Sequence, residues 1–403
     1  MTMPHARSAP REHSKGGALR LAAALALVAC TREPREHATA EAAAPDGARA
    51  MPVSIGPIAT GAAFDLVGAP HGAFVVWGRP EQGGGGIALR ALDAHGAARG
   101  SERSLVPREP PFTVSEIVAA VAGGRIGVAW VESSVGAVRT RSLVVPEGDG
   151  VPGHPVLLAT ASPELGAGRG RVAIAALDGG RVRVMYAAGA TECASSGQAE
   201  CVGFAFEEIE GGARGRREPW LSVPQPCPEG AAHLAGLDGR FFYAVCSWRG
   251  DAPSTMAYAI NVETYYARAD EVLRGCAPLG MVVIDAATVL LGADCGVLRR
   301  AARLTLDLKP AAEFPLADLT LACRGDRPAI RATGWELPLD GPRSQLAAVL
   351  PESIAPAGAR AVWTGRALLV AQRMSGRLEL RRYECRDGTL HSETSAATPG
   401  AGR

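Results

Sequence analysis

The sequence predicts an all-β protein built from repeated β-hairpins, and three observations lead to this prediction. The 403 residues include 49 Gly and 29 Pro, an excess that indicates many turns. Short apolar segments rich in Val, Ile and aromatic residues recur in pairs, separated by tight-turn dipeptides such as Asp-Gly and Gly-Gly, the usual signal of a hairpin. The pairs recur with a mean spacing of about 49 residues. A hydrophobic content of 47% excludes a disordered chain.

The hairpins follow one another along most of the chain. The expected pairs of strands span residues 63–77, 117–130, 172–186, 233–245, 281–291, 319–337 and 360–370. The pair at 319–337 is the weakest, because Pro328 and Gly334 interrupt its strands. A third apolar segment follows most pairs, as at 86–92, 135–145, 202–209, 256–262 and 378–384, and a weaker fourth often comes next, as at 104–106 and 155–158. Runs of this length and composition favour strands over helices.

Four strands in 40–50 residues, repeated six or seven times, is the arithmetic of a β-propeller. We therefore predict a propeller of seven blades, with six as the alternative, over residues 51–392. Two or three β-sandwiches in series also stay open, although they give no reason for the period. The segment Val53-Ser54-Ile55 precedes the first hairpin, and our hypothesis is that it closes the ring by pairing with the last blade. The chain carries neither the Ser-x-Asp-x-Gly-x-x-Trp box of sialidase-type propellers nor a Trp-Asp repeat, so no propeller subclass is indicated.

The N-terminus has the pattern of a secretory signal. Basic residues Arg7, Arg11, Lys15 and Arg20 precede an apolar run of nine residues, 21–29. Nine residues cannot cross a bilayer core of about 30 Å, which takes roughly 20 helical residues. A positively charged start and a short apolar run are typical of a signal peptide.

The end of this run, Leu27-Val28-Ala29-Cys30, resembles the lipobox of bacterial lipoproteins. The resemblance covers about 30 residues and implies that residues 1–29 are removed and that Cys30 is lipidated, which anchors the protein to a membrane. Thr31 in place of an Asp favours the outer membrane. Residues 30–50 lack hydrophobic periodicity and are expected to be a disordered tether, and residues 393–403 a disordered tail. An ordinary signal followed by a chance cysteine remains the alternative.

Eight cysteines remain after Cys30, and an even number in an exported chain favours disulfides. The pairs Cys227–Cys246 and Cys276–Cys295 each span 19 residues and are offset by 49, so each brackets a hairpin whose ends lie together. Cys193–Cys201 flank a loop between second and third strands, and Cys323–Cys385 are left to pair. Free buried thiols are the alternative. The cysteines lack the C-x-x-C or clustered-His spacing of a metal site, so no metal is predicted.

Sequence motifs that carry chemistry are sparse. A net charge of +1, from 42 Lys and Arg against 41 Asp and Glu, argues against a nucleic-acid binder driven by a basic field. The sequence contains no G-x-S-x-G, H-E-x-x-H, P-loop or dinucleotide fingerprint. We therefore predict no catalytic residue and no cofactor.

A binding site is expected on the face of the ring where loops between second and third strands meet the loops that join blades. The candidates there are Arg79, Glu81, Trp220, Trp248, Arg249 and Asp251. Arg and Trp are common interface anchors, so the leading interpretation is an extracytoplasmic lipoprotein whose propeller binds or scaffolds an envelope protein or another ligand. The alternatives are a lyase or hydrolase, and a structural component of the envelope. An enzyme predicts convergent titratable groups with shifted pKa values in the central funnel, whereas a binding module predicts exposed aromatic and Arg anchors on a loop face.

Overall fold

The computed structural model describes residues 53–58, 61–80, 86–107, 109, 112–161, 172–188, 203–210, 213–217, 233–236, 241–249, 253–261, 266–285, 288–305, 308–339 and 345–393. All of them belong to one compact unit, Gly47–Arg403. Their strands form seven antiparallel sheets, and within them no helix is long and apolar enough to cross a membrane. The all-β prediction is confirmed.

Five sheets each contain four strands in sequence order. The first comprises β2 (Phe64–Ala69), β3 (Gly72–Gly78), β4 (Ile87–Leu92) and β5 (Ala98–Val106). The second comprises β6 (Thr113–Ala122), β7 (Arg125–Ser133), β8 (Val138–Pro146) and β9 (Val156–Ala161). The third comprises β10 (Val172–Ala176), β11 (Val182–Ala188), β12 (Gly203–Glu210) and β13 (Ala213–Arg217). The fourth comprises β14 (His233–Gly236), β15 (Phe241–Arg249), β16 (Pro253–Asn261) and β17 (Tyr266–Arg274). The fifth comprises β18 (Ala277–Asp285), β19 (Thr288–Asp294), β20 (Arg299–Leu304) and β21 (Pro310–Pro315).

The last two sheets depart from this plan. The sixth has three strands among the described residues, β22 (Thr320–Arg324), β23 (Arg327–Ala332) and β24 (Trp335–Pro338). The seventh comprises β25 (Arg360–Trp363), β26 (Leu368–Met374) and β27 (Arg377–Arg386), and both β1 (Val53–Pro57) and β28 (Thr389–Glu393) pair with the outer edge of β27.

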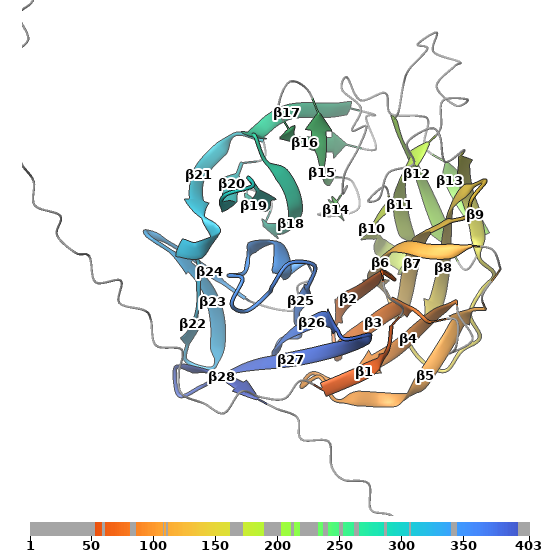
Figure 1. The fold of residues 1–403 in the computed structure, drawn as a ribbon, viewed down its shortest axis with the longest axis horizontal. Helices are drawn as coiled ribbons and strands as arrows, with labels where there is room; N and C mark the ends of the chain where they lie inside the picture. The colour runs from red at the N-terminus through yellow and green to blue at the C-terminus, as the bar shows by residue number, and fades with distance from the viewer. Residues whose placement is uncertain are drawn as a thin grey trace, which may run out of the picture. The chain divides into compact units, whose positions relative to one another are not determined.

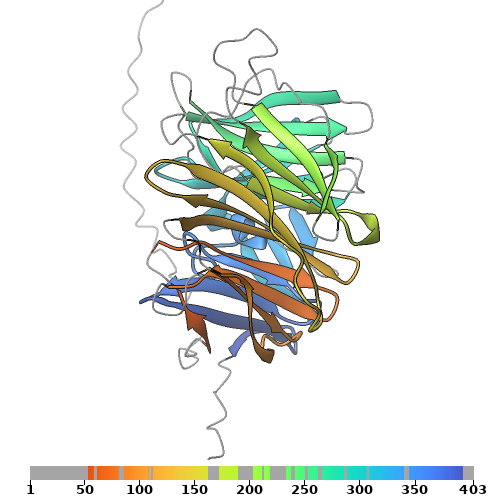
Figure 2. The same ribbon diagram turned by 90° about the vertical axis from the view of Figure 1, so that its right-hand side faces the viewer.

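The sheets are arranged as a seven-bladed β-propeller (Figure 1). The first strands β2, β6, β10, β14 and β18 contact one another in succession, and β25 of the seventh sheet contacts β2 of the first. Figure 2, turned by 90°, shows neighbouring sheets lying face over face. A Cβ added to Gly127 on β7 would lie 2.4 Å from Cγ1 of Val182 on β11, so the second and third sheets approach too closely for a side chain there. Each sheet therefore buries its faces against its neighbours.

Strand β1 closes the ring. It pairs antiparallel with β27, with Val53 opposite Leu380 and Ser54 opposite Glu379. The side chain of Ile55 is buried in a cluster that joins the first and seventh sheets. Its carbonyl oxygen accepts a 2.5 Å hydrogen bond from Nη1 of Arg90 on β4. The hypothesis that the segment Val53-Ser54-Ile55 pairs with the last blade is confirmed.

A helical turn, η6 (Leu346–Val349), replaces an inner strand between the fifth and seventh sheets. It contacts β18 and β19 on one side and β25 on the other, whereas β22 of the sixth sheet contacts β27 and β28. A Cβ on Gly292 of β19 would lie 1.7 Å from the carbonyl oxygen of Ala348, which shows how closely η6 is packed. The sequence predicts a sixth copy like the others. Its hairpin at 319–337 does form, with Pro328 opposite Cys323, but η6 occupies the place next to β18 and β25.

Candidate functional site on the face of the second-strand loops

The alternation of antiparallel strands gives the ring two faces of different make-up. We call face I the end of the sheets where each second strand finishes, as at Gly78 of β3, Ser133 of β7 and Asp294 of β19. Face II is the opposite end, where each first strand finishes, as at Ala69 of β2 and Ala122 of β6. Face I is the face on which the sequence predicts a binding site.

Arg79 directly follows β3 and lies on face I, where it is bound to its own sheet. Its Nη2 lies 2.6 Å from Oε1 of Glu102 on β5, and its Nη1 donates a 3.4 Å hydrogen bond to Oγ of Ser104. Only 20% of its side chain is exposed. The guanidinium therefore joins strands within the first sheet.

The other predicted binding residues are placed less completely. Trp248 and Arg249 are the last residues of β15, so the topology puts their backbone on face I; their side chains lie outside the description. Glu81, Trp220 and Asp251 lie outside the described residues. Their grouping with Arg79 stays a prediction.

Two disulfides fix parts of the ring. Cys276 precedes β18 and is bonded to Cys295, which follows β19 at face I. Cys323 of β22 is bonded to Cys385 of β27, so this bond links the sixth sheet to the seventh. These are two of the four pairs predicted from the sequence. Of the other two pairs, Cys193–Cys201 and Cys227–Cys246, only the backbone of Cys246 in β15 is described.

Face I contains a cavity of about 500 Å³ beside the Cys276–Cys295 bond. Three segments line it: residues 294–299 at the turn between β19 and β20, the 3-10 turn η5 (Leu316–Asp318) after β21, and residues 351–353 before β25. The fold thus brings together segments from the fifth and seventh sheets and the connection to the sixth. We call this cavity the face I pocket.

The face I pocket combines an apolar lip with a directed ion pair. The side chain of Val297 is fully exposed, with 102% of its reference area accessible, and Leu298 next to it is also exposed. Nε of Arg299 lies 2.9 Å from Oε1 of Glu352; the arginine is 17% exposed and the glutamate 63%. Asp294 shapes the turn, because its Oδ1 accepts a 2.9 Å hydrogen bond from the N–H of Gly296. Such a pocket offers apolar contact next to a guanidinium whose carboxylate partner faces solvent.

Sequence reasoning did not single out these residues. The pocket forms from three segments that lie far apart in the sequence, and none of them carries a motif. The available signal was local: Cys295, expected to be disulfide-bonded at the end of a second strand, is followed by Gly296-Val297-Leu298, an apolar segment where a polar turn is usual.

The second sheet presents a different arrangement on face I, in which charges neutralise one another. The buried carboxylate of Glu132 lies 2.5 Å from Nη2 of Arg139 and accepts a 3.1 Å hydrogen bond from Nε1 of Trp130. Glu109, in the connection from the first sheet, accepts a 2.9 Å hydrogen bond from Arg141, and this bond holds the pKa of Glu109 below its usual value. The network fastens the connection between two sheets. The neighbouring loop carries Val135, which is 101% exposed.

The inner strands contain one carboxylate with a shifted pKa, Asp65 of β2. Burial raises the pKa of Asp65, although Arg360 of β25 and two backbone N–H groups oppose the shift. Its Oδ2 accepts a 2.8 Å hydrogen bond from the N–H of Ala119 on β6, and its Oδ1 lies 3.5 Å from Nε of Arg360. Asp65 therefore joins the first strands of three sheets. Among the described residues no group of three His, Cys, Asp or Glu side chains is placed to hold a metal ion.

Comparisons with known proteins add little to this geometry. No family model and no curated protein matches the chain. A fucose-complexed mutant of Aleuria aurantia lectin is similar with a TM-score of 0.45 and 10% identity, over 85% of this chain and 99% of that chain. A prolyl endopeptidase is similar with a TM-score of 0.41 and 13% identity, over 82% of this chain and 49% of that chain. Synechocystis apocarotenoid oxygenase is similar with a TM-score of 0.39 and 9% identity, over 62% of this chain and 59% of that chain. Likenesses of this size carry no information on function.

Proposed function

We propose that this protein is a membrane-anchored extracytoplasmic lipoprotein whose propeller binds a protein ligand at the face I pocket. One observation carries the binding role: the fully exposed Val297 lies beside the Arg299–Glu352 ion pair, on a turn that follows a disulfide-bonded cysteine. An apolar side chain and an arginine next to each other are the usual make-up of an interface anchor.

The energetics of the pocket favour a peptide segment as the ligand. Covering Val297 and Leu298 removes apolar area from water, which stabilises a complex by about 25 cal/mol per Å². The Cys276–Cys295 bond restrains the turn, and a restrained loop loses less conformational entropy on binding. Because Glu352 is largely exposed, a carboxylate of the ligand can compete with it for Arg299. The expected epitope therefore has an apolar side chain close to a carboxylate.

Anchoring to the membrane is supported by the lipobox-like segment that ends at Cys30. Two disulfides in the described residues agree with an oxidising compartment. Metabolic labelling with a palmitate analogue tests the anchor. Label is expected on the wild type and absent from Cys30→Ser; equal labelling of both would contradict lipidation at Cys30.

Selection from a phage-displayed random peptide library tests the pocket. The bait is the chain from residue 30 onward with Cys30→Ser, and the selected peptides are then measured against variants. Val297→Asp and Arg299→Gln should weaken binding about tenfold or more, equivalent to roughly 1.4 kcal/mol. Val135→Asp is the matched control, since Val135 is an equally exposed valine in the corresponding loop of the second sheet. Peptides that lose affinity for Val135→Asp and retain it for Val297→Asp would contradict the site.

A further inference from the structure

A second cavity, of about 470 Å³, lies on face II between the first and second sheets. The turn between β2 and β3, the last residues of β4 and the first residues of β5 form one wall, and the turn after β8 forms the other. We call it the face II pocket. It shares no lining residue with the face I pocket.

The walls of the face II pocket carry opposite charges. His71 and Arg99 belong to the wall from the first sheet, and Glu147 and Asp149 belong to the wall from the second sheet. None of these four side chains has an ion pair or a hydrogen bond within the part of the chain that the structure describes. Elsewhere in the ring, Arg79, Arg139 and Arg299 are paired with carboxylates. The face II pocket therefore differs in keeping cations and anions apart across an open space.

Two contacts hold the walls in place. Arg103 of β5 donates from Nη1 to the carbonyl oxygen of Pro146 at 3.0 Å and from Nη2 to that of Gly150 at 2.9 Å, so one guanidinium bridges both ends of the acidic turn. On the other wall, a Cβ added to Gly72 would lie 2.1 Å from the carbonyl oxygen of Leu92. The turn that carries His71 is thus packed closely against β4.

The floor of the pocket is apolar. Phe74, Leu89 and Leu92 line it and are buried. A cavity of this volume falls within the range of small-molecule sites, about 300–1,000 Å³. Few polar groups above an apolar floor are also typical of such sites.

We propose that the face II pocket binds a small zwitterion, namely a short peptide or amino acid with free termini and an apolar side chain. The carboxylate of the ligand pairs with Arg99 and His71, its ammonium group pairs with Glu147 and Asp149, and its side chain lies on the floor. Charge-assisted hydrogen bonds of both kinds are stronger than neutral ones. A neutral ligand with separated charges matches a pocket whose charges balance but are held apart.

Calorimetric titration with the dipeptide leucyl-alanine tests the proposal on the chain from residue 30 onward carrying Cys30→Ser. Two capped forms separate the walls: leucyl-alanine amide lacks the carboxylate, and acetyl-leucyl-alanine lacks the ammonium group. Leucyl-alanine should bind more tightly than either capped form, by about tenfold or more, because each cap removes one set of charge-assisted bonds. Equal affinity for all three, or absence of binding at millimolar leucyl-alanine, would overturn the proposal.

Variants of the two walls should show opposite selectivity. Arg99→Gln should weaken leucyl-alanine about tenfold and leave the affinity for leucyl-alanine amide unchanged. Glu147→Gln combined with Asp149→Asn should do the reverse, lowering affinity for leucyl-alanine but not for acetyl-leucyl-alanine. Arg366→Gln is the control, since Arg366 is an exposed arginine in the turn before β26 and should change neither. If Arg99→Gln keeps the wild-type unfolding temperature and the wild-type affinity for leucyl-alanine, the assignment is wrong.

Discussion

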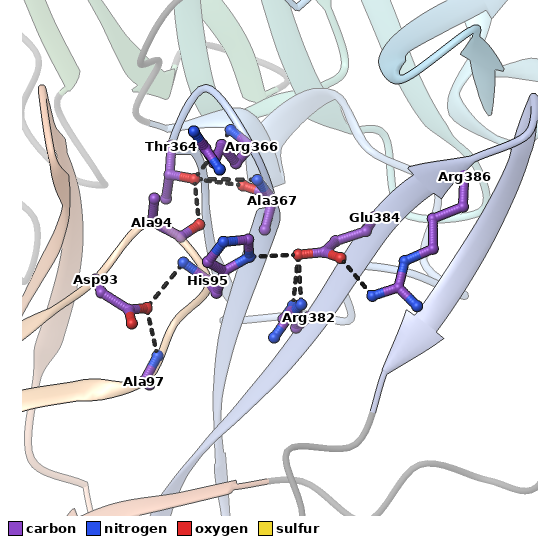
Figure 3. Close-up of polar contacts among 10 residues, drawn as sticks. All are labelled: Asp93, Ala94, His95, Ala97, Thr364, Arg366, Ala367, Arg382, Glu384 and Arg386. Carbon is purple, nitrogen blue, oxygen red and sulfur yellow. Dashed lines mark hydrogen bonds and ion pairs between the residues drawn. The ribbon is translucent and has the colours of Figure 1, made fainter.

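Nδ1 of His95 lies 2.8 Å from Oε1 of Glu384, although the two residues are 289 positions apart in the sequence (Figure 3). His95 belongs to the turn between β4 and β5 in the first sheet, and Glu384 belongs to β27 in the seventh. Arg382 and Arg386 donate to the same carboxylate at 2.8 and 3.0 Å. A second bond, 2.7 Å from Oγ1 of Thr364 to the carbonyl oxygen of Ala94, joins the same turn to the seventh sheet. The ends of the chain are thus held together on face II by polar contacts as well as by β1.

Stability should fall at acid pH partly through Glu384. Burial raises the pKa of Glu384, but the hydrogen bond from His95 and the two arginines outweigh burial, so the pKa lies below its ordinary value of 4.5. A carboxylate with a lowered pKa stabilises the fold above the unfolded value and loses that contribution as pH falls through the folded value. Glu384→Gln should therefore lower the free energy of unfolding at pH 7 by roughly 1–3 kcal/mol, with the difference shrinking toward pH 3.

Urea denaturation at several pH values measures this effect. Glu313→Gln serves as the control, because Glu313 forms an exposed pair with Arg300 at 3.6 Å and such pairs contribute about 0–1 kcal/mol. A Glu384→Gln variant as stable as the wild type at pH 7 would show that the contacts drawn in Figure 3 do not stabilise the closure.

Closure by β1 predicts a large cost for Ile55→Ala. Ile55 is buried between the first and seventh sheets, and truncation of a buried isoleucine to alanine costs about 2–5 kcal/mol. Ser54 on the same strand is exposed, so Ser54→Ala should change stability little. Thermal unfolding of the two variants decides the matter: equal unfolding temperatures would mean that β1 does not hold the ring closed.

The position of η6 predicts a strong effect at Gly292. An alanine there would place its Cβ 1.7 Å from the backbone oxygen of Ala348, so η6 must move and the packing of Leu346 and Val349 must change. Gly136 has open space around its Cβ position and is the matched control. Gly292→Ala should lower the unfolding temperature and speed amide exchange at residues 346–350, whereas Gly136→Ala should do neither. Wild-type exchange in Gly292→Ala would contradict the placement of η6.

The Cys276–Cys295 bond should matter for binding as well as for stability. By the chain-entropy model, a closed loop of this length stabilises by about 3 kcal/mol, so Cys276→Ser with Cys295→Ser should unfold at lower temperature. Because Cys295 adjoins the face I pocket, the same variant should also bind the selected peptides more weakly. Removing Cys323–Cys385 should reduce stability but leave peptide affinity unchanged. Equal loss of affinity in both double variants would indicate a general destabilisation instead.

The sequence predicts the repeating part of the fold because that part is encoded locally. Gly123 and Gly124 both adopt positive φ, and such turn dipeptides reveal each hairpin without knowledge of its neighbours. The Cys276–Cys295 pairing follows from the same local logic. By contrast, η6 lacks strand periodicity, and its place is set by packing against Gly292. The His95–Glu384 bond and both pockets join segments far apart in the sequence, so no local pattern could predict them.

Amide hydrogen exchange on the chain with and without a library-selected peptide tests the central claim most directly. The face I pocket predicts new protection at residues 294–299 and 351–353, with exchange unchanged in the equivalent loop at 134–137. It also predicts unchanged exchange on face II at residues 147–149. Protection confined to the loop at 134–137 or to face II, with residues 294–299 unaffected, would contradict the assignment of the binding site.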